Sequence, residues 1–401
     1  MSGVDAIVVG QGGGSTAVIN ETLAGAIHEA RERKVRKILG VRNGLEGLIE
    51  GDFVDLTNFD IEIIRGSRGA YLGTTRINEE DVDMGVVKGN LSGVRADGLI
   101  FFGGQDTAKV LATIGRLGIP CVHGAKTIDN DLEESHHTPG FGSATLYNAK
   151  NVRFMTQDAF SYGSLNLGVL VIYQVMGRNT GWLAQGCAFA RYDSQGRVIE
   201  GATPDIIWPA ERDFDEIEFA DAVRDVFDKR KKMSGRRMAF VVVSEGVSKE
   251  VDGKRVSLAS LTGNVVRDPH GNEQYGLFGA GSAAEYFVIA AREGFRDKLK
   301  IIPVIAGYPQ RSYEKSGVDA EEAFELGRET LRADAEGDGG KSVVIQRGDD
   351  GGFFNARVPL DSVAGKTRYV GKEYWDGGIY GPNETFIREF SGVAGLEYGL
   401  G

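Results

Sequence analysis

Short apolar runs that end in glycine alternate with longer amphipathic stretches in the first third of the chain. The run AIVVGQGGG at 6–14 precedes a helical pattern over 15–34, and GLIFFGG at 98–104 precedes another over 106–118. Alternating strands and helices are typical of a parallel α/β sheet, in which ligands bind beyond the carboxyl ends of the strands. We therefore expect the functional residues in the glycine turns that follow these strands.

The middle of the chain repeats this pattern and predicts a second α/β lobe. Residues 165–177 and 236–246 read as buried strands, and a helical pattern over 182–192 follows the first of them. One more buried strand is predicted over 301–308, and an amphipathic helix over 320–337 follows it. The rest of the chain is rich in glycine and irregular in pattern, so we expect an appended segment or tail there.

Composition and charge narrow the classes of partner. The chain has 401 residues, 41% of them hydrophobic, which is enough to bury a large core in two lobes. The formal net charge of −11 repels nucleic acid and anionic membrane surfaces, so neither is expected as a partner. Two cysteines are too few for a disulfide framework, and no basic leader precedes the first strand, which together favour a cytoplasmic protein.

Two glycine turns have the form of phosphate sites. Gly12–Thr16 lies between a strand and a helix, where backbone N–H groups and the helix dipole can bind a phosphate; a plain tight turn is the alternative. The second turn, GGQDT at 103–107, places Asp106 or Thr107 where either can cap the following helix. Capping is therefore the alternative to a functional role for Asp106.

A third cluster, GAKTIDND at 124–131, gathers groups that serve phosphoryl transfer. Asp129 and Asp131 offer a general base and a carboxylate that orients the proton, and Lys126 offers a cation for the transferring group. Thr127 adds a hydroxyl. Because a solvated loop rarely needs all of these groups together, the cluster favours phosphoryl-transfer chemistry over a structural turn.

Five motifs occur in the order and approximate spacing of the phosphofructokinase family. They are GG-x-D-T at 103–107, KTIDND at 126–131, MGR at 176–178, SEG at 244–246 and GY-x-QR at 307–311. The resemblance extends from about residue 5 to residue 330, and within the family the chain resembles the branch that uses inorganic pyrophosphate. The resemblance implies two Rossmann-like α/β lobes with mostly parallel sheets and an active site in the cleft between them.

The resemblance also implies separate roles for parts of the chain. We expect a donor-binding lobe of residues 1–160 plus about 280–330, a sugar-substrate lobe of about 161–280, and a C-terminal extension of 331–401. Members of the family are usually oligomers in which active sites draw on neighbouring subunits. A homodimer or homotetramer is therefore expected.

Two positions favour pyrophosphate over ATP as the phosphoryl donor. In the family, a glycine in place of Asp106 leaves room for the α-phosphate of a nucleotide, so a carboxylate there would repel that group. Members that use ATP tend to have glycine where Lys126 stands. A lysine at that position can pair with the compact diphosphate leaving group.

The resemblance implies a role for each site residue. Asp129 resembles the general base that takes the proton from the 1-hydroxyl of the sugar, and Thr127 would help to hold that hydroxyl. Gly14, Gly104 and Arg76 would contact the donor. The residues that would contact the sugar substrate are Met176, Gly177, Arg178, Glu245, Tyr308 and Arg311.

The implied metal is Mg²⁺, held mostly by pyrophosphate oxygens and water. Gln105 stands where many members place an aspartate that helps to hold this metal, although some pyrophosphate-type relatives have a neutral amide there. Gln174 stands where the family usually has glutamate. Counting from MGR and from QR, Val169 and Ile302 occupy the positions of two arginines that bind the 6-phosphate of the sugar, and neither can bind an anion.

Three functions therefore remain open. The leading prediction is Mg²⁺-dependent transfer of a phosphoryl group from pyrophosphate to the 1-hydroxyl of fructose 6-phosphate, giving fructose 1,6-bisphosphate. The first alternative, favoured by Val169 and Ile302, is a pyrophosphate-dependent kinase for another sugar, polyol or sugar phosphate. The second alternative is a homologue retained as a binding or regulatory subunit without turnover.

Overall fold

The chain forms two compact units. Unit 1 comprises Met1–Ala144 and Arg311–Arg368, and unit 2 comprises Thr145–Gln310 and Tyr369–Gly401, so the chain passes from one unit to the other three times. The structure, a computed structural model, describes residues 6–75, 82–193, 195–199, 201–263, 266, 281–295 and 298–396.

Unit 1 is built on a seven-stranded sheet in the order β13-β12-β5-β4-β1-β2-β3. Neighbouring strands from β12 to β2 pair in parallel, whereas β13 and β3 run antiparallel to their neighbours at the two edges. Strands β1 and β4 are buried along their whole length, as their largely apolar sequences predict. The strands are β1 Ala6–Gln11, β2 Lys37–Val41, β3 Phe53–Asp55, β4 Gly98–Gly103, β5 Cys121–Ala125, β12 Lys341–Arg347 and β13 Phe353–Pro359.

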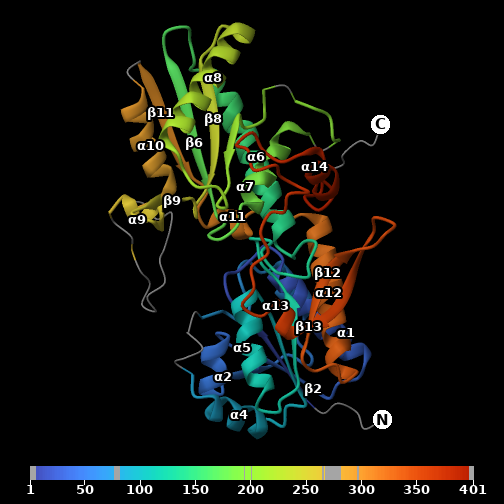
Figure 1. Cartoon of the computed structure of the whole chain (residues 1–401). Coiled ribbons are helices and arrows are strands. Elements are labelled where there is room, and N and C mark those ends of the chain that lie inside the picture. Colours follow the sequence, from blue (N-terminus) through green and yellow to red (C-terminus); the bar gives the residue numbers. More distant parts are fainter. Residues whose placement is uncertain are drawn as a thin grey trace. The chain divides into compact units, whose positions relative to one another are not determined.

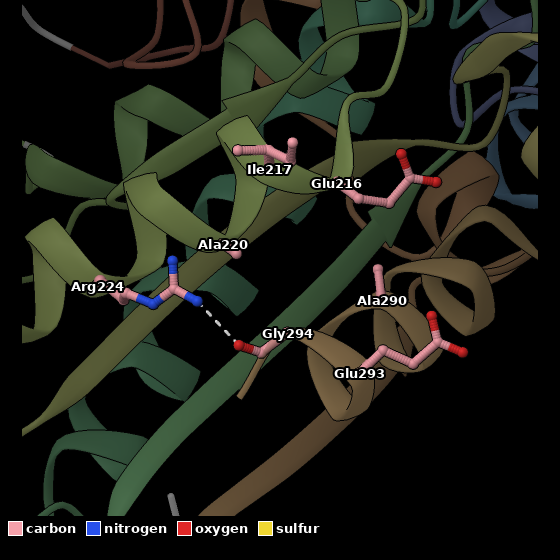
Figure 2. Close-up of a pocket in the computed structure, with 7 residues that line it drawn as sticks. All are labelled: Glu216, Ile217, Ala220, Arg224, Ala290, Glu293 and Gly294. Carbon is pink, nitrogen blue, oxygen red and sulfur yellow. Dashed lines mark hydrogen bonds between the residues drawn. The ribbon is translucent and has the colours of Figure 1, made fainter. Parts of the chain in front are cut away.

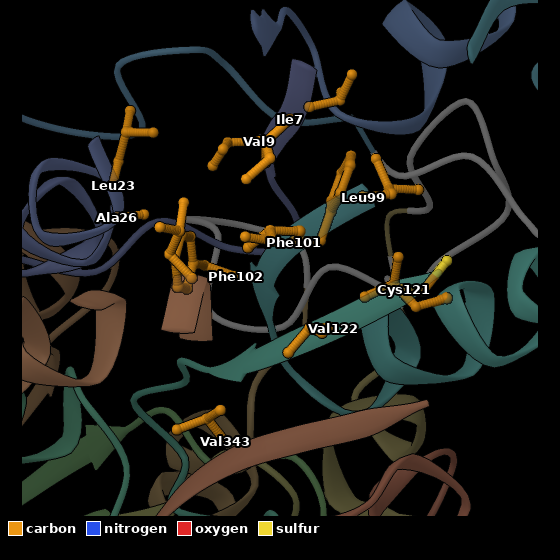
Figure 3. Packing of buried hydrophobic residues seen from close by; sticks show 14 of the residues in the cluster. Ile7, Val9, Leu23, Ala26, Leu99, Phe101, Phe102, Cys121, Val122 and Val343 are labelled. Carbon is orange, nitrogen blue, oxygen red and sulfur yellow. The ribbon is translucent and has the colours of Figure 1, made fainter. Parts of the chain in front are cut away.

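Helices cover this sheet and complete its core. Leu23 and Ala26 on the apolar face of α1 join Ile7, Phe102 and Val122 from the parallel strands in one hydrophobic cluster (Figure 3). Helices α1 and α12 lie side by side (Figure 1). The helices are α1 Ile19–Glu32, α2 Leu45–Glu50, α3 Ile61–Gly66, α4 Met84–Gly93, α5 Gln105–Gly115, α12 Gly317–Ala335 and α13 Leu360–Val363, while α6 Phe141–Phe160 and α11 Pro309–Ser312 each run from one unit into the other.

Unit 2 contains a four-stranded parallel sheet in the order β11-β6-β8-β7 and a separate antiparallel pair, β9 and β10. Helix α8 begins after Asp215, whose carboxylate accepts a hydrogen bond from the N–H of Glu218, and ends before Gly235 in the left-handed region. The elements are β6 Gly168–Val175, β7 Ile206–Trp208, β8 Met238–Ser244, β9 Ser248–Val251, β10 Lys254–Ser257, β11 Leu299–Ile305, α7 Trp182–Gly186, η2 Cys187–Arg191, α8 Glu216–Ser234, α9 Leu258–Leu261, α10 Ala283–Gly294 and α14 Glu384–Phe390.

The C-terminal part of the chain is built into both units. Strand β12 pairs in parallel with β5, so residues 341–359 complete the sheet of unit 1. The N–H of Ile207 donates a hydrogen bond of 2.7 Å to the carbonyl of Ile379, which covers the edge strand β7 of unit 2. The expectation of an irregular tail is therefore wrong, because these short segments pair with strands that are distant in the sequence.

The structure confirms an α/β architecture with mostly parallel sheets, but the unit boundaries differ from the predicted lobes. The chain leaves unit 1 inside α6 at Ala144 and not at residue 160. Strand β11 pairs with β6 and so belongs to unit 2, whereas residues 331–368 belong to unit 1 rather than to an extension. A run of apolar residues predicts a strand, but it does not reveal which sheet the strand joins.

A buried carboxylate in α12 predicts that stability falls as the pH rises. The Oδ1 atom of Asp334 is buried and has no hydrogen-bond partner among the residues that the structure describes. Burial, and then the charge of Asp97, raises the pKa of Asp334 to about 7. Because the folded state favours the protonated form, this contribution to stability is complete below the ordinary carboxyl pKa of 3.8 and is lost as the pH rises through about 7.

We expect Asp334→Asn to raise the free energy of unfolding above neutral pH by roughly 1–3 kcal/mol, because it removes a buried charge that lacks a partner. It should also flatten the dependence of the unfolding midpoint on pH, which denaturant titrations at several pH values measure. Asp361→Asn is the matched control, since the Asp361 side chain is 82% exposed and the variant removes the same charge. An equal change in both variants would assign the effect to net charge and not to Asp334.

Candidate active site

The first glycine turn follows β1 and is held by Lys126. Gly13 has a φ of +70°, in the region that favours glycine. The Nζ atom of Lys126 donates hydrogen bonds to the carbonyl oxygens of Gly12 at 2.9 Å and of Gly14 at 2.6 Å. Because Lys126 is only 1% exposed, its ammonium places a buried positive charge against a turn that has the form of a phosphate site.

Arg311 lies beside the same turn. A Cβ atom added at Gly14 would lie 3.1 Å from the Cζ atom of Arg311. The sequence predicts that Arg311 and Tyr308 share the far end of the sugar, whereas the structure assigns Tyr308 to unit 2 and Arg311 to unit 1. Arg311 is therefore placed against the donor-side turn, and its contact with the sugar stays a prediction.

Asp106 lies in the first turn of α5 and is exposed. The N-cap of this helix is Gly104, and no side chain among the described residues makes a capping hydrogen bond there. The capping alternative for Asp106 is therefore wrong. The positive end of the helix dipole favours a carboxylate at this position, and the charge of Asp106 helps to raise the pKa of Asp131.

The loop after β5 brings two carboxyl groups together. The backbone N–H of Asp129 donates to the Oγ1 of Thr127 at 3.1 Å, and Thr127 also hydrogen-bonds the carboxyl group of Asp131. Burial, followed by the charges of Asp129 and Asp106, raises the pKa of Asp131 to about 7. Burial, together with the charges of Asp129 and Asp106, therefore keeps Asp131 partly protonated near neutral pH, which suits one base and one proton-holding partner.

Asp319 of α12 anchors the end of this loop. Its carboxylate accepts hydrogen bonds from the N–H of Gly140 at 2.8 Å and from the N–H of Ser143 at 2.9 Å, and the Ser143 hydroxyl donates to it as well. Thr138 closes the loop by donating from Oγ1 to the carbonyl of Thr127 at 2.8 Å. Sequence reasoning missed Asp319 because its partners lie 176 and 179 residues away, and a lone aspartate in a helical pattern gives no signal.

The side chain and the backbone of Gln105 both accept hydrogen bonds within unit 1. Its Oε1 accepts a hydrogen bond from Thr367 at 3.2 Å, and its backbone carbonyl accepts one from the N–H of Gly365. Within the described ranges, no three His, Cys, Asp or Glu side chains are grouped closely enough to hold a metal ion. The Asp106 carboxylate, whose charge acts on Asp131, is nevertheless the kind of oxygen ligand that suits a hard cation taking most of its ligands from a bound phosphate compound.

In unit 2, the MGR and SEG turns pack against each other at the carboxyl ends of the adjacent strands β6 and β8. The N–H of Glu245 donates to the carbonyl of Val175 at 2.9 Å. A Cβ atom at Gly246 would lie 1.7 Å from the carbonyl oxygen of Arg178, so only glycine allows this approach. The packing brings Glu245 and Arg178 to one edge of the sheet, as parallel α/β folds do with their functional turns.

Gln310, which belongs to the GY-x-QR motif, connects that motif to the MGR turn through hydrogen bonds. Its Oε1 accepts a hydrogen bond from the N–H of Met176 at 3.2 Å, and its Nε2 donates to the carbonyl of Gly307 at 2.9 Å. Gly177, next to Met176, has a φ of +115°. Tyr308 is 52% exposed and so is not a core residue of unit 2. Gln310 was missed as a site-forming residue although it stands inside the GY-x-QR motif.

The two positions at which the family places arginines for the 6-phosphate carry apolar side chains. Val169 is buried in β6 and Ile302 is half-buried in β11. Gln174 has a structural partner, because its Oε1 accepts a hydrogen bond from the N–H of Ala284 at 2.9 Å. Arg76 lies outside the described residues.

A pocket of about 300 Å³ lies between α8 and α10 of unit 2 (Figure 2). On its α8 side, Arg224 donates from Nη2 to the carbonyl of Gly294 at 2.9 Å. The pocket is lined by Glu216, Ile217, Ala220, Arg224, Ala290, Glu293 and Gly294, and no predicted site residue is among them. We therefore look for the chemistry in the glycine turns and not in this pocket.

Comparison with known proteins gives one family. The family model for phosphofructokinase matches residues 6–333. A pyrophosphate–fructose 6-phosphate 1-phosphotransferase from Rhodospirillum rubrum is 33% identical over 380 residues, which cover 90% of this chain and 87% of the relative. A sulfofructose kinase from Alkalicoccus urumqiensis is 28% identical over 96% of this chain and 92% of the relative.

Solved structures give the same result for the fold. The crystal structure of a pyrophosphate-dependent phosphofructokinase from Nitrosospira multiformis matches with a TM-score of 0.79 and 25% identity, over 97% of this chain and 92% of that one. In the described part of the chain, no helix combines the length and hydropathy needed to cross a bilayer.

Proposed function

We propose that this chain, which belongs to the phosphofructokinase family and is a phosphotransferase, transfers a phosphoryl group from pyrophosphate to the 1-hydroxyl of fructose 6-phosphate. The observation that carries the donor assignment is Asp106, an exposed carboxylate in the first turn of α5 that has no capping role. Through its charge it is coupled to Asp131 in the loop that contains Asp129. Pyrophosphate-dependent relatives support the same donor.

Charge at the donor site explains the choice of donor. The resemblance places the α-phosphate of a nucleotide where Asp106 stands, so a bound ATP would bring two negative groups together. Pyrophosphate has no third phosphate and avoids this repulsion. The Lys126 ammonium, held against the first glycine turn, would then attract the diphosphate and stabilise the phosphate that leaves.

The reaction requires a base that takes the proton from the acceptor hydroxyl. In the proposed step, Asp129 accepts the proton of the sugar 1-hydroxyl while the oxygen attacks the terminal phosphorus and the bond to the bridging oxygen breaks. Asp131, held partly protonated, hydrogen-bonds Thr127 and keeps the loop in place. Arg178 and Glu245, which the β6 and β8 turns present, would hold the sugar.

Magnesium fits this donor set as a cofactor that arrives with pyrophosphate. Asp106 would hold it together with phosphate oxygens and water, and Gln105 would lie at the edge of its site. When bound, Mg²⁺ would neutralise charge on the diphosphate oxygens and make the phosphorus easier to attack. The chain's own lysine and arginine would act on the same oxygens.

A second acceptor is favoured by one specific observation. Val169 is buried and Ile302 is half-buried, so neither offers the charge that the family uses for a sugar 6-phosphate. A relative named as a sulfofructose kinase aligns with 96% of this chain. A pyrophosphate-dependent kinase for sulfofructose, or for another sugar or polyol, is therefore the second candidate.

Turnover with defined donors and acceptors tests the proposal. The purified enzyme with Mg²⁺ is assayed for phosphate release from pyrophosphate with fructose 6-phosphate, sulfofructose, fructose or a polyol, and ATP replaces pyrophosphate in a parallel series. We expect pyrophosphate to support turnover at least about 100-fold better than ATP, which corresponds to roughly 2.7 kcal/mol of repulsion between Asp106 and the α-phosphate. Turnover with ATP alone would contradict the assignment of pyrophosphate as the donor. Turnover only with sulfofructose would contradict the assignment of fructose 6-phosphate as the acceptor.

A further inference from the structure

Glu211 joins the acceptor-side turn to the C-terminal segment within unit 2. Its Oε1 accepts a hydrogen bond from the N–H of Gly181 at 3.0 Å and another from the N–H of Val370 at 3.1 Å. Gly181 ends the turn that begins at Met176 and directly precedes α7. One carboxylate oxygen therefore holds two backbone donors that are far apart in the sequence.

The opposite end of this turn has its own anchor. Gln310 accepts the N–H of Met176, and Gly246 packs against the carbonyl of Arg178. Arg178 thus lies between an anchor at Met176 and an anchor at Gly181. Loss of the Gly181 anchor weakens the hold on the second end of the turn, so Arg178 is placed less firmly.

The C-terminal segment is firmly packed and can serve as the frame for this anchor. Trp182, the residue after Gly181, is fully buried, and its ring lies 5.6 Å from that of Tyr374 and 5.5 Å from that of Phe390. Arg212, next to Glu211, donates to the carbonyl of Gly377. The segment that contains Val370 therefore has contacts that do not depend on Glu211.

Burial of the Glu211 carboxylate is unfavourable for the stability of the fold. Its Oε2 atom is buried and has no hydrogen-bond partner in the part of unit 2 that the structure describes. Burial raises the pKa of Glu211, although the N–H groups of Gly181 and Val370 oppose this. A buried acid with one oxygen that lacks a partner contributes little net stability, so it suits a role in placing the turn.

We propose that Glu211 is a positioning residue for the acceptor: it sets the Met176–Gly181 turn, and hence Arg178, by tying Gly181 to the C-terminal segment at Val370. The inference rests on the proposed function. It gives residues 370–396 a part in acceptor binding. Glu211 does not contact the reacting atoms in this role.

Paired variants on both sides of the bridge test this inference. Glu211→Leu removes the acceptor oxygen, and Val370→Pro removes one donor, whereas Glu211→Gln and Val370→Ala keep the two hydrogen bonds and serve as matched controls. We expect the first pair to raise the KM for the acceptor by roughly 10- to 100-fold, the effect of a small displacement of a binding group. The KM for pyrophosphate should change by less than about twofold in all four variants.

Hydrogen exchange of the backbone amides in 176–182 supplies a readout that does not need turnover. Glu211→Leu and Val370→Pro should speed exchange at Gly181 while α8 and β8 keep their protection, and the two control variants should exchange like the parent. Unchanged exchange, or faster exchange with an unchanged acceptor KM, would overturn the inference. If the parent enzyme shows no turnover, only the proposed function fails, and exchange together with calorimetric binding of fructose 6-phosphate still decides the role of Glu211.

Discussion

Asp129→Asn is expected to lower kcat by about 10²–10⁴-fold, the range for loss of a positioned general base. An amide keeps the size and hydrogen-bonding shape of the side chain but cannot accept the proton of the sugar hydroxyl. The backbone N–H of Asp129 still donates to Thr127, so the loop should keep its form. The KM values for pyrophosphate and for the acceptor should therefore change much less than kcat, and steady-state kinetics with each substrate varied in turn measures this.

Asp131→Asn is the matched comparison for this variant. Asp131 is 7% exposed, and burial with the nearby charges raises its pKa to about 7, so it is partly protonated when Asp129 is ionised. An asparagine imitates the protonated acid, and we expect a loss in kcat of about tenfold or less. A larger loss in Asp131→Asn than in Asp129→Asn would reverse the two roles and make Asp131 the base. Thermal unfolding of both variants checks that each remains folded.

The local sequence pattern predicts those parts of the fold in which the type of each residue follows from its own burial. Strands β1 and β4 consist almost entirely of apolar residues and glycine because both faces are covered, and glycine marks the turn after each of them. Strand β12 escaped prediction because its seven residues lie in a glycine-rich region and pair with β5, more than two hundred residues earlier. A parallel pairing across such a distance leaves no local signal, and it also decides to which unit a segment belongs.

Some residues of the candidate site could likewise be predicted from local motifs, and others could not. Asp106, Lys126 and Asp129 stand in motifs at the ends of strands, so their gathering in unit 1 follows from the topology of a parallel sheet. Asp319 and Glu211 carry no motif, because their importance lies in backbone N–H groups that approach from distant segments. Arg311 was assigned to the sugar from its motif, while its contact with Gly14 comes from a fold in which neighbouring residues of one motif belong to different units.

Lys126→Met is expected to lower kcat/KM for pyrophosphate by about 10²–10³-fold, comparable to removing one preorganised donor from an anion site. The Nζ atom of Lys126 holds the carbonyls of Gly12 and Gly14 and places positive charge behind the turn. Methionine fills nearly the same volume but cannot donate a hydrogen bond. Both the shape of the turn and the attraction for the diphosphate are therefore lost together, while the KM for the acceptor should stay within about threefold.

Gly13→Ala separates these two contributions. Gly13 has a φ of +70°, and a Cβ atom there would lie 3.8 Å from the Lys126 Nζ, so alanine strains the turn and leaves the ammonium in place. If shape dominates, both variants lose affinity for pyrophosphate to a similar degree. If charge dominates, Gly13→Ala keeps most of the activity and Lys126→Met does not.

Lys37→Met is the control for removal of a positive charge, because Lys37 is exposed at the beginning of β2. It should leave kcat/KM for pyrophosphate within about twofold of the parent, since an exposed lysine is screened by solvent and salt. Lys126→Met should in addition lower the unfolding midpoint, because two carbonyls lose a charged donor in a buried place. A lower midpoint with unchanged kcat/KM would make Lys126 a purely structural residue, and the donor assignment would then depend on Asp106 alone.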